Sequence, residues 1–521
     1  MALSHIGFLG DKLTGKNLEY AVCATASSGF LLFGYDQGVM SGIITEEIFL
    51  ESFPLMAKEY KSSAIQAMVV AIYEIGCLIG SIIIICYGDQ LGRRRAVLIG
   101  AIIMLVGTVI QTTAFSMAQL IVGRIVTGAG NGMNTSSIPV WQSEMAPPKI
   151  RGFLVLFEGA LITCGIMISY WLNYGFYFVT QYGSFQWRFP FAFQAVFGII
   201  LIVGILALPE SPRWLVKHGK EDAAKEILGR LYLKPADSPE IEKDVEEMRA
   251  INRLTSGKLT VKEFFSNGPE KNRWRASVAF GAQAFQQIGG INLVTYYATS
   301  VFEESLHFGP SLSRFLTAWN GTEYFLAAVA ALFVVDRLGR RRLMIWGAAG
   351  MAGCLLIIGA CLSTGNQTAG YAATAFIFLF NSFFALGWLG VTWLYPAEVT
   401  PLRIRAEANG LSTSANWFFN YVVVQLAPIM ISTIAWRTYF VFMCFNLAFI
   451  PVVFFFFPET NGYKLEKLDA IFAEAHEKKE NPVWTERHVR KGAVLDTEQR
   501  MERGASITSG PTPAEEKGIQ D

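Results

Sequence analysis

The stretch Tyr87-Gly88-Asp89-Gln90-Leu91-Gly92-Arg93-Arg94-Arg95 returns late in the chain as Val335-Asp336-Arg337-Leu338-Gly339-Arg340-Arg341-Arg342. Each copy follows one apolar run and precedes another, so a basic loop joins two apolar segments in both places. The repetition indicates that one architectural unit occurs twice in this chain. Two related helical bundles with a site at their seam would have this pattern.

The composition is that of a membrane protein. Of the 521 residues, 52% are hydrophobic and only 16% are charged, whereas average soluble domains carry about 25% charged residues. The apolar residues are grouped in blocks of about 20, the length of a helix that crosses a bilayer. We therefore predict an all-α membrane protein with about twelve transmembrane helices. The expected spans lie near 20–42, 63–86, 96–114, 117–140, 153–175, 190–208, 276–302, 314–335, 343–363, 371–396, 407–431 and 437–457.

These spans divide the chain into five parts. An N-terminal tail (1–19) precedes a first bundle (20–208), and a charged linker (209–275) with short amphipathic helices leads to a second bundle (276–457) and a polar tail (458–521). Cytoplasmic loops carry an excess of lysine and arginine. The basic residues that fall together on one side are Arg93, Arg94, Arg95, Lys149, Arg151, Arg340, Arg341, Arg342, Arg403 and Arg405. Because the linker and both termini share that side, we expect all of them to be cytoplasmic.

Acidic and basic residues recur at matching offsets around the two basic loops. Gly92 and Gly339 permit a sharp turn between closely packed helices, and each loop offers a carboxylate that is able to cap a helix or meet an arginine. The residues concerned are Asp89, Arg93, Glu144 and Arg151 in the first half, and Asp336, Arg340, Glu398 and Arg405 in the second. We interpret them as a cytoplasmic gate that holds helices together in one conformation. The alternative is topology alone, with arginines retained by the positive-inside rule.

Two further motifs follow the last span of each half. They are Pro209-Glu210-Ser211-Pro212-Arg213-Trp214-Leu215 and Pro458-Glu459-Thr460-Asn461-Gly462. Together with the two Gly-Arg-Arg-Arg loops, they make the chain similar to the sugar porter branch of the major facilitator superfamily, from about Gly34 to Gly462. The resemblance implies two six-helix bundles around a central cavity, with cytoplasmic helices between them. It also adds Glu210 and Arg213 to the expected gate.

Asp36 lies inside the first expected span, where an ionisable residue is costly and is a functional candidate by default. Its expected partner is Arg124 of the fourth span, because a permanently charged guanidinium would hold the carboxylate ionised. Separation of the pair would let Asp36 take up a proton and would couple that proton to a conformational change. Asp36 also matches the proton-binding aspartate of plant and bacterial sugar–proton symporters, where animal facilitators carry asparagine. A purely structural buried pair is the alternative.

The seventh expected span contains Gln286-Gln287-Ile288-Gly289-Gly290-Ile291-Asn292, in which glycines would let the helix bend or break. Amides donate and accept hydrogen bonds, as sugar hydroxyls do, although bonds between helices would explain them as well. The match to the corresponding element of sugar porters favours substrate contact. The residues assigned to the sugar are Gln286, Gln287, Asn292 and Tyr297, with Trp393 against the pyranose ring and Asn416 and Asn420 one turn apart on the eleventh span.

Four positions depart from the sugar porter pattern. Glu158 and Gly159 occupy the place of a usual sugar-contacting glutamine, a change that resembles fungal members, including glycerol–proton symporters. Glu323 and Tyr324 fall where an asparagine is expected in the eighth span. These residues, and the intramembrane acid Glu74, are candidates for tuning specificity or proton flow, or they face a wet cavity or a partner.

We therefore predict a plasma-membrane symporter that imports a hexose or pentose with a proton by alternating access. A glycerol or polyol–proton symporter, a passive sugar facilitator and a sugar sensor remain alternatives. The expected partners are a sugar or polyol, protons and the lipid bilayer. Phosphate-loop and metal signatures are absent and the five histidines do not cluster, so we expect no enzyme activity, no cofactor and no nucleic-acid partner.

Overall fold

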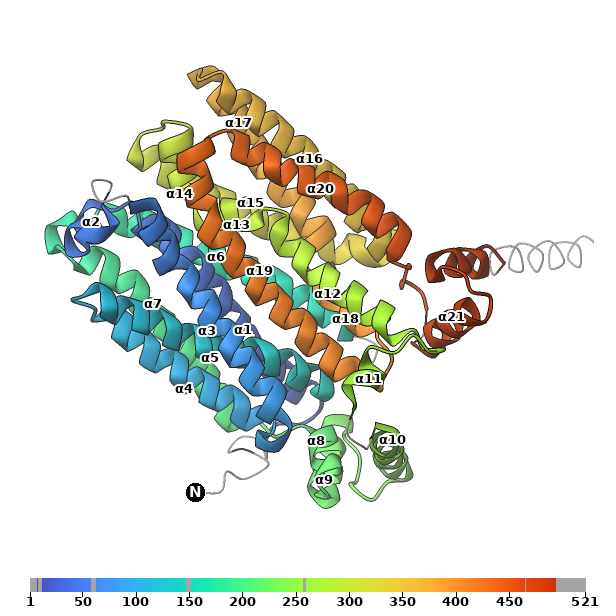
Figure 1. Ribbon diagram of the computed structural model, residues 1–521. Helices are drawn as coiled ribbons and strands as arrows, with labels where there is room; N and C mark the ends of the chain where they lie inside the picture. Colours follow the sequence, from blue (N-terminus) through green and yellow to red (C-terminus); the bar gives the residue numbers. More distant parts are fainter. Residues whose placement is uncertain are drawn as a thin grey trace, which may run out of the picture.

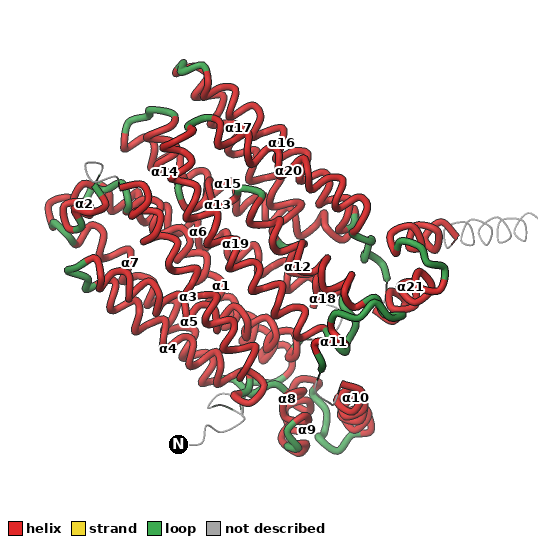
Figure 2. Tube along the Cα trace, in the orientation of Figure 1, coloured by secondary structure: helices red, strands yellow, loops and turns green. Residues whose placement is uncertain are grey.

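The computed structural model describes residues 7, 12–57, 62–146, 151–255, 259–463 and 465–492, apart from the side chains of residues 62, 151, 254, 255, 465 and 466. Across these ranges the regular structure is entirely helical and no strand occurs, as Figure 2 shows. The all-α prediction is confirmed. The tail after residue 492 and most of the first 11 residues lie outside the described part of the chain.

The first half is a bundle of long helices (Figure 1). These are α1 (Gly15–Ile43), α3 (Ser62–Leu91), α4 (Arg93–Thr112), α5 (Met117–Met145), α6 (Arg151–Tyr177) and α7 (Phe185–Ala207), with the short α2 (Glu47–Ser52) after α1. Within this bundle α1 packs on α6 and α7, and α5 packs on both α3 and α4. A side chain on Gly132 of α5 would meet the carbonyl oxygen of Cys77 on α3, so the glycine permits this close approach.

The second half is a related bundle in which two helices are interrupted. Its elements are α12 (Asn272–Ile288), α13 (Ile291–Tyr296), α14 (Ala298–Ser300), α15 (Pro310–Leu338), α16 (Arg340–Ser363), α17 (Gln367–Phe384), α18 (Val391–Val399), α19 (Arg405–Ile434) and α20 (Arg437–Phe456). The break between α12 and α13 falls at the expected glycines. Gly290 has a φ of 96° and packs against the ring of Phe442, which a Cβ would approach to 3.1 Å.

A helix or an interrupted helix occupies each of the expected spans. Judged by length and hydropathy within the described residues, nine helices qualify as membrane-spanning, so the expected count of twelve is not confirmed in full by this criterion. The expected spans that do not qualify correspond to α1, α5 and the broken α12–α13 pair. The break leaves α12 with 17 residues and α13 with 6, so neither is long enough. In α1 and α5, buried polar residues such as Asp36 and Arg124 lower the hydropathy without exposing charge to lipid.

Short helices cover one end of the bundles (Figure 1). They are α8 (Pro212–Lys217), α9 (Glu221–Tyr232), α10 (Pro239–Thr255) and α11 (Val261–Phe264) between the halves, and α21 (Leu465–Glu477) after the second half. We call this end, which also carries Gly92 and Gly339, the linker face, and the opposite end the far face. Along the seam between the bundles, α3 packs against α19 and α6 packs against α15.

Candidate functional site

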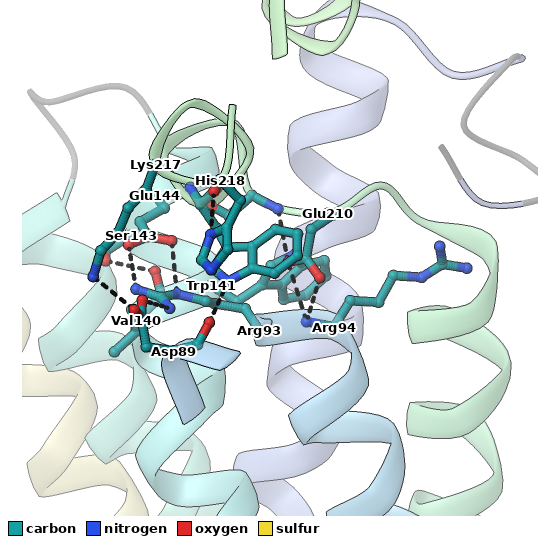
Figure 3. Close-up of polar contacts among 12 residues, drawn as sticks. Asp89, Arg93, Arg94, Val140, Trp141, Ser143, Glu144, Glu210, Lys217 and His218 are labelled. Carbon is teal, nitrogen blue, oxygen red and sulfur yellow. Dashed lines mark hydrogen bonds and ion pairs between the residues drawn. The ribbon is translucent and has the colours of Figure 1, made fainter. Parts of the chain in front are cut away.

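A charged cluster ties together the helices of the first half at the linker face (Figure 3). Arg93 at the start of α4 donates to both carboxylate oxygens of Glu144 on α5, each at 3.2 Å. It also lies 3.6 Å from Asp89 of α3, and Asp89 in turn pairs with Lys217 of α8 at 2.8 Å. One arginine therefore links three helices of the bundle, and a lysine connects the cluster to the linker.

Glu210 caps the N-terminus of α4 within the same cluster (Figure 3). Its carboxylate accepts from the backbone amides of Arg94 at 3.2 Å and Ser211 at 2.9 Å. Burial raises the pKa of Glu210, although these two backbone hydrogen bonds oppose the shift. Gly92, with a φ of 85°, leaves room for this carboxylate, because a Cβ there would lie 2.9 Å from Glu210 Oε2.

The second half repeats this arrangement. Arg340 pairs with Glu398 at 3.0 Å and with Asp336 at 2.9 Å. Glu459 accepts from the backbone amides of Arg340 at 2.9 Å and Arg341 at 3.1 Å, and a Cβ on Gly339 would lie 2.5 Å from its Oε2. Glu459 was not among the expected gate residues, although its Pro-Glu dipeptide matches Pro209-Glu210 after the first bundle.

The remaining gate candidates have other surroundings. Arg405 donates to the carbonyl of Thr400 at 3.0 and 3.2 Å, and the described partners of Glu398 are Arg340 and Thr460. The Nε of Arg213 is buried without a hydrogen-bond partner among the described residues. Arg151 begins α6, but its side chain lies outside the described part of the structure. The structure therefore brings together the expected residues around Arg93 and around Arg340.

Asp36 and Arg124 face each other in the interior of the first bundle. Their closest atoms, Asp36 Oδ1 and Arg124 Nη1, are 3.9 Å apart, and both side chains are fully buried. Within the described residues neither carboxylate oxygen of Asp36 accepts a hydrogen bond. Arg124 donates to the carbonyl of Val70 at 3.1 Å and lies over the ring of Tyr73, with its Cζ 4.7 Å from the centroid. The pair is thus a loose ion pair, close enough for attraction but not for a hydrogen bond.

A second buried carboxyl connects this region to the other bundle. Glu74 of α3 is completely buried and accepts a hydrogen bond from the hydroxyl of Tyr296, at the end of α13. Arg124 interacts electrostatically with both Asp36 and Glu74. One buried arginine therefore serves two buried carboxyls, and one of those carboxyls contacts the second bundle directly.

The expected substrate amides form one hydrogen-bonded cluster in the second bundle. Asn416 of α19 donates to Gln286 of α12 at 2.7 Å and to Gln283 at 2.5 Å. Gln287 donates to Gln286 at 3.2 Å and accepts from Asn292 of α13 at 2.6 Å. Gln283 was not expected, but it lies one helical turn before Gln286 and Gln287, which is a signal for a shared face. The cluster joins both sides of the helix break to α19.

The other residues assigned to the sugar lie around this cluster. Asn420 is buried one turn after Asn416, and its Oδ1 has no hydrogen-bond partner in the described part of the chain. Tyr297 donates to the carbonyl of Val424 at 2.9 Å. Trp393 of α18 is partly buried, whereas the indole of Trp388 is fully buried and donates to the carbonyl of Met344 at 3.0 Å. Trp393 is thus the more accessible of the two indoles.

The four departures from the sugar porter pattern lie on α6 and α15. Glu158 is buried, and a Cβ on the adjacent Gly159 would lie 3.4 Å from Leu389, which precedes α18 in the second bundle. Glu323 accepts a hydrogen bond from Ser382 of α17, and Tyr324 beside it is buried. Gly159 therefore lies at the seam, while Glu323 is held within the second bundle.

Polar contacts join the two bundles at the far face. Arg314 of α15 donates to Thr45, which follows α1, at 2.6 Å. Trp171 of α6 donates to Thr322 of α15 at 2.9 Å, and Tyr170 donates to the carbonyl of Thr295. These contacts hold the far ends of the bundles together in this conformation.

The structure consists of two related helical bundles, with a buried ion pair in one and an amide cluster in the other. This combination defines a multi-pass membrane transporter of the major facilitator type. The family described as "Sugar (and other) transporter" matches residues 22–472, and this chain belongs to it.

Named relatives agree with this assignment. The sugar transporter STL1 of Saccharomyces cerevisiae is 39% identical over 479 residues, which are 90% of this chain and 84% of that protein. The glucose transporter GlcP of Staphylococcus epidermidis is 33% identical over 466 residues, 87% of this chain and 97% of that protein. The solved structure of the proton:xylose symporter XylE with 6-bromo-6-deoxy-D-glucose has a TM-score of 0.74 at 26% identity, covering 88% of this chain and 100% of that one. These relatives are transporters, and the chain is not an enzyme.

Proposed function

We propose that the protein imports a monosaccharide, a hexose or a pentose, together with a proton across the plasma membrane. The observation that carries this proposal is the buried pair of Asp36 and Arg124, 3.9 Å apart and without exposure to solvent. A permanently charged arginine cannot supply the proton, so the carboxyl is the group that exchanges it. The named symporter XylE, which shares this fold, supports the same reading.

Proton uptake by Asp36 changes the balance of charge around Arg124. A neutral carboxyl attracts the guanidinium less, and Glu74 is then the other buried carboxyl that interacts with Arg124. Since Glu74 accepts from Tyr296 of the second bundle, a movement of Arg124 towards Glu74 competes with that hydrogen bond. Protonation in the first bundle is thereby linked to the contacts that close the seam.

The amide cluster supplies hydrogen-bonding groups for the sugar. In the present conformation the amides of Gln283, Gln286, Gln287, Asn292 and Asn416 satisfy one another. A polyhydroxylated solute replaces these bonds with bonds of similar kind, because each of its hydroxyls both donates and accepts. Asn420 adds an acceptor, its Oδ1, that has no hydrogen-bond partner among the described residues. Trp393 offers a ring face to the sugar C–H groups.

The linker face acts as the cytoplasmic gate in this proposal, with both termini in the cytoplasm. The first bundle (20–208) and the second bundle (276–457) rock against each other around the site, and the linker (209–275) follows one of them. The matching clusters around Arg93 and Arg340 keep each bundle rigid at that face. The residue groups around Glu210 and Glu459 fix the turns that connect their helices.

A second candidate is transport of glycerol or another polyol with a proton. It is favoured by Glu158 and Gly159, which remove an amide from the expected sugar contacts and add a buried carboxyl next to Gly159. A passive facilitator and a sugar sensor are further alternatives, and the buried Asp36 argues against the first of these.

Uptake and proton movement together test the proposal. Labelled glucose, xylose and glycerol are offered, at two external pH values, to a host that lacks its own carriers. The purified protein is also placed in vesicles with a dye that reports external pH. We expect faster uptake of a monosaccharide at the lower pH and alkalinisation of the medium as it enters. Uptake without alkalinisation would indicate a passive facilitator, and the absence of uptake would indicate a sugar sensor. A preference for glycerol would indicate the polyol–proton symporter.

A further inference from the structure

A basic cavity opens at the linker face of the second bundle, away from the Asp36 and amide sites. It has a volume of about 390 Å³ and lies between the α15–α16 turn, the end of α20 and the helical stretch 482–492. Figure 1 shows these elements at the same end of the bundle. The volume falls in the range of small-ligand pockets, about 300–1,000 Å³. Its arginines are Arg337, Arg341, Arg342, Arg487 and Arg490.

The two acids that line the cavity are already engaged. Glu459 accepts backbone hydrogen bonds from Arg340, Arg341 and its own downstream neighbours. Glu486 is buried and accepts from Arg490 at 2.7 Å and from the hydroxyl of Tyr463 at 3.2 Å. Five arginines against two glutamates leave the lining with a net formal charge of +3.

In the part of the chain that the structure describes, no ion pair involves Arg337, Arg342 or Arg487. Arg341 is only 9% exposed and donates from Nη2 to the carbonyl of Phe454, while its Nε has no hydrogen-bond partner within the described residues. Arg337 and Arg342 are exposed at the rim, and the ion pairs of the described chain include neither of them. Arg487 is held by ring faces instead, with its Cζ 4.6 Å from the centroid of Phe454 and 4.4 Å from that of Trp484. The cavity is thus a concave surface with a net positive charge, which suits an anionic ligand.

The chemistry of such a cavity matches a phosphate group. Guanidinium groups present planar pairs of N–H donors that fit the oxygens of a phosphate, and several of them around one concavity balance its double charge. A carboxylate would engage one guanidinium and leave the others uncompensated. A phosphomonoester, with up to two negative charges and three accepting oxygens, fits the +3 lining better.

The surroundings favour a lipid as the carrier of that phosphate. Phe454, Phe455 and Phe456 at the end of α20 are 38%, 46% and 47% exposed, and Trp484 is 36% exposed. Aromatic side chains of this kind lie at the level of lipid headgroups, and basic pockets beside transmembrane helices bind anionic headgroups. We propose that this cavity binds the phosphomonoester headgroup of a membrane lipid, such as a phosphorylated inositol. This assignment is independent of the transported solute.

Binding to the full-length protein tests the inference. The probe is a fluorescent short-chain phosphatidylinositol 4-phosphate in detergent, competed with inorganic phosphate and with soluble inositol trisphosphate. The test variant is Arg342→Gln with Arg487→Gln, and the matched control is Arg95→Gln, the corresponding arginine of the first half, which does not line the cavity. We expect the double variant to bind the probe at least about 10-fold more weakly, and Arg95→Gln to bind like the wild type.

Each outcome decides the inference. Equal binding by all three proteins, or no binding by the wild type, would overturn it. If soluble phosphates compete as well as the lipid does, the cavity is a phosphate site but its ligand is not a membrane lipid. The thermal unfolding temperature of each variant is compared with that of the wild type to show that it is folded. If the double variant fails this check, the single Arg342→Gln change at the exposed rim replaces it.

Discussion

Replacing Asp36 with asparagine is the most direct test of the proposed coupling. The substitution keeps the shape of the side chain and removes the only carboxyl found in an ion pair with Arg124 among the described residues. Arg124 keeps its hydrogen bond to Val70 and its place over Tyr73, and the carboxyl of Glu74 remains beside it. We therefore expect Asp36→Asn to fold and to bind sugar, but to carry no proton.

The size of the effect follows from the single charge that Asp36 handles. One proton per sugar, moving down a membrane potential of 100 mV, provides about 2.3 kcal/mol. Because about 1.36 kcal/mol corresponds to a factor of ten, the wild type should accumulate its sugar about 50-fold at that potential. Without the proton the inside and outside concentrations become equal, so Asp36→Asn should reach a ratio of about 1 while still exchanging labelled for unlabelled sugar.

The assay is sugar accumulation in proteoliposomes with an imposed potential. A matched control is Asp222→Asn, the same chemical change at an exposed position of α9, which should accumulate sugar like the wild type. If Asp36→Asn still accumulates sugar about 50-fold and a protonophore abolishes that gradient, then another group carries the proton and the reasoning about Asp36 is refuted.

Three further predictions concern the contacts around the site. Tyr296→Phe removes the hydrogen bond to Glu74, so one bond across the seam between the bundles is lost. Cysteines placed at the far face should then be labelled faster than in the wild-type protein. Unchanged labelling would contradict the role of this hydrogen bond in holding the bundles together. Glu459→Gln should lower the free energy of unfolding by about 2 kcal/mol, seen as a lower unfolding temperature. Glu474→Gln, at a partly exposed position, should change it by less than about 0.5 kcal/mol. Burial raises the pKa of Glu46, in the α1–α2 loop, from 4.5 to about 8. Between these two pH values the carboxyl is ionised in the unfolded chain but still protonated in the folded protein. The free energy of unfolding therefore falls as the pH rises through this window. Glu46→Gln should therefore be more thermostable than the wild type at the upper end of that window and similar at the lower end.

Much of the fold could be predicted from the order of apolar and charged residues. A spanning helix needs a run of about 20 apolar residues, and such runs are local, so the positions of α4, α7 and α16 agree with the expected spans to within a few residues. The break after Ile288 was signalled by two adjacent glycines. Asp36 and Arg124 stood out as a pair because charges inside membrane segments are rare and need compensation.

The contacts that complete the site depended on residues far apart in the chain. Glu459 caps the helix that begins at Arg340, 119 positions away, and Asn416 contacts Gln283 across 133 positions. Glu74 meets Tyr296 across 222 positions, and the basic cavity gathers its arginines from the α15–α16 turn and from the helical stretch that follows the second bundle. Hydropathy and spacing carry no information on which face of one helix meets which face of another, because that choice is made by packing of the whole bundle. The sequence alone therefore determined where the apolar segments lie and which charges are buried in them, and only the tertiary structure decided which of them touch.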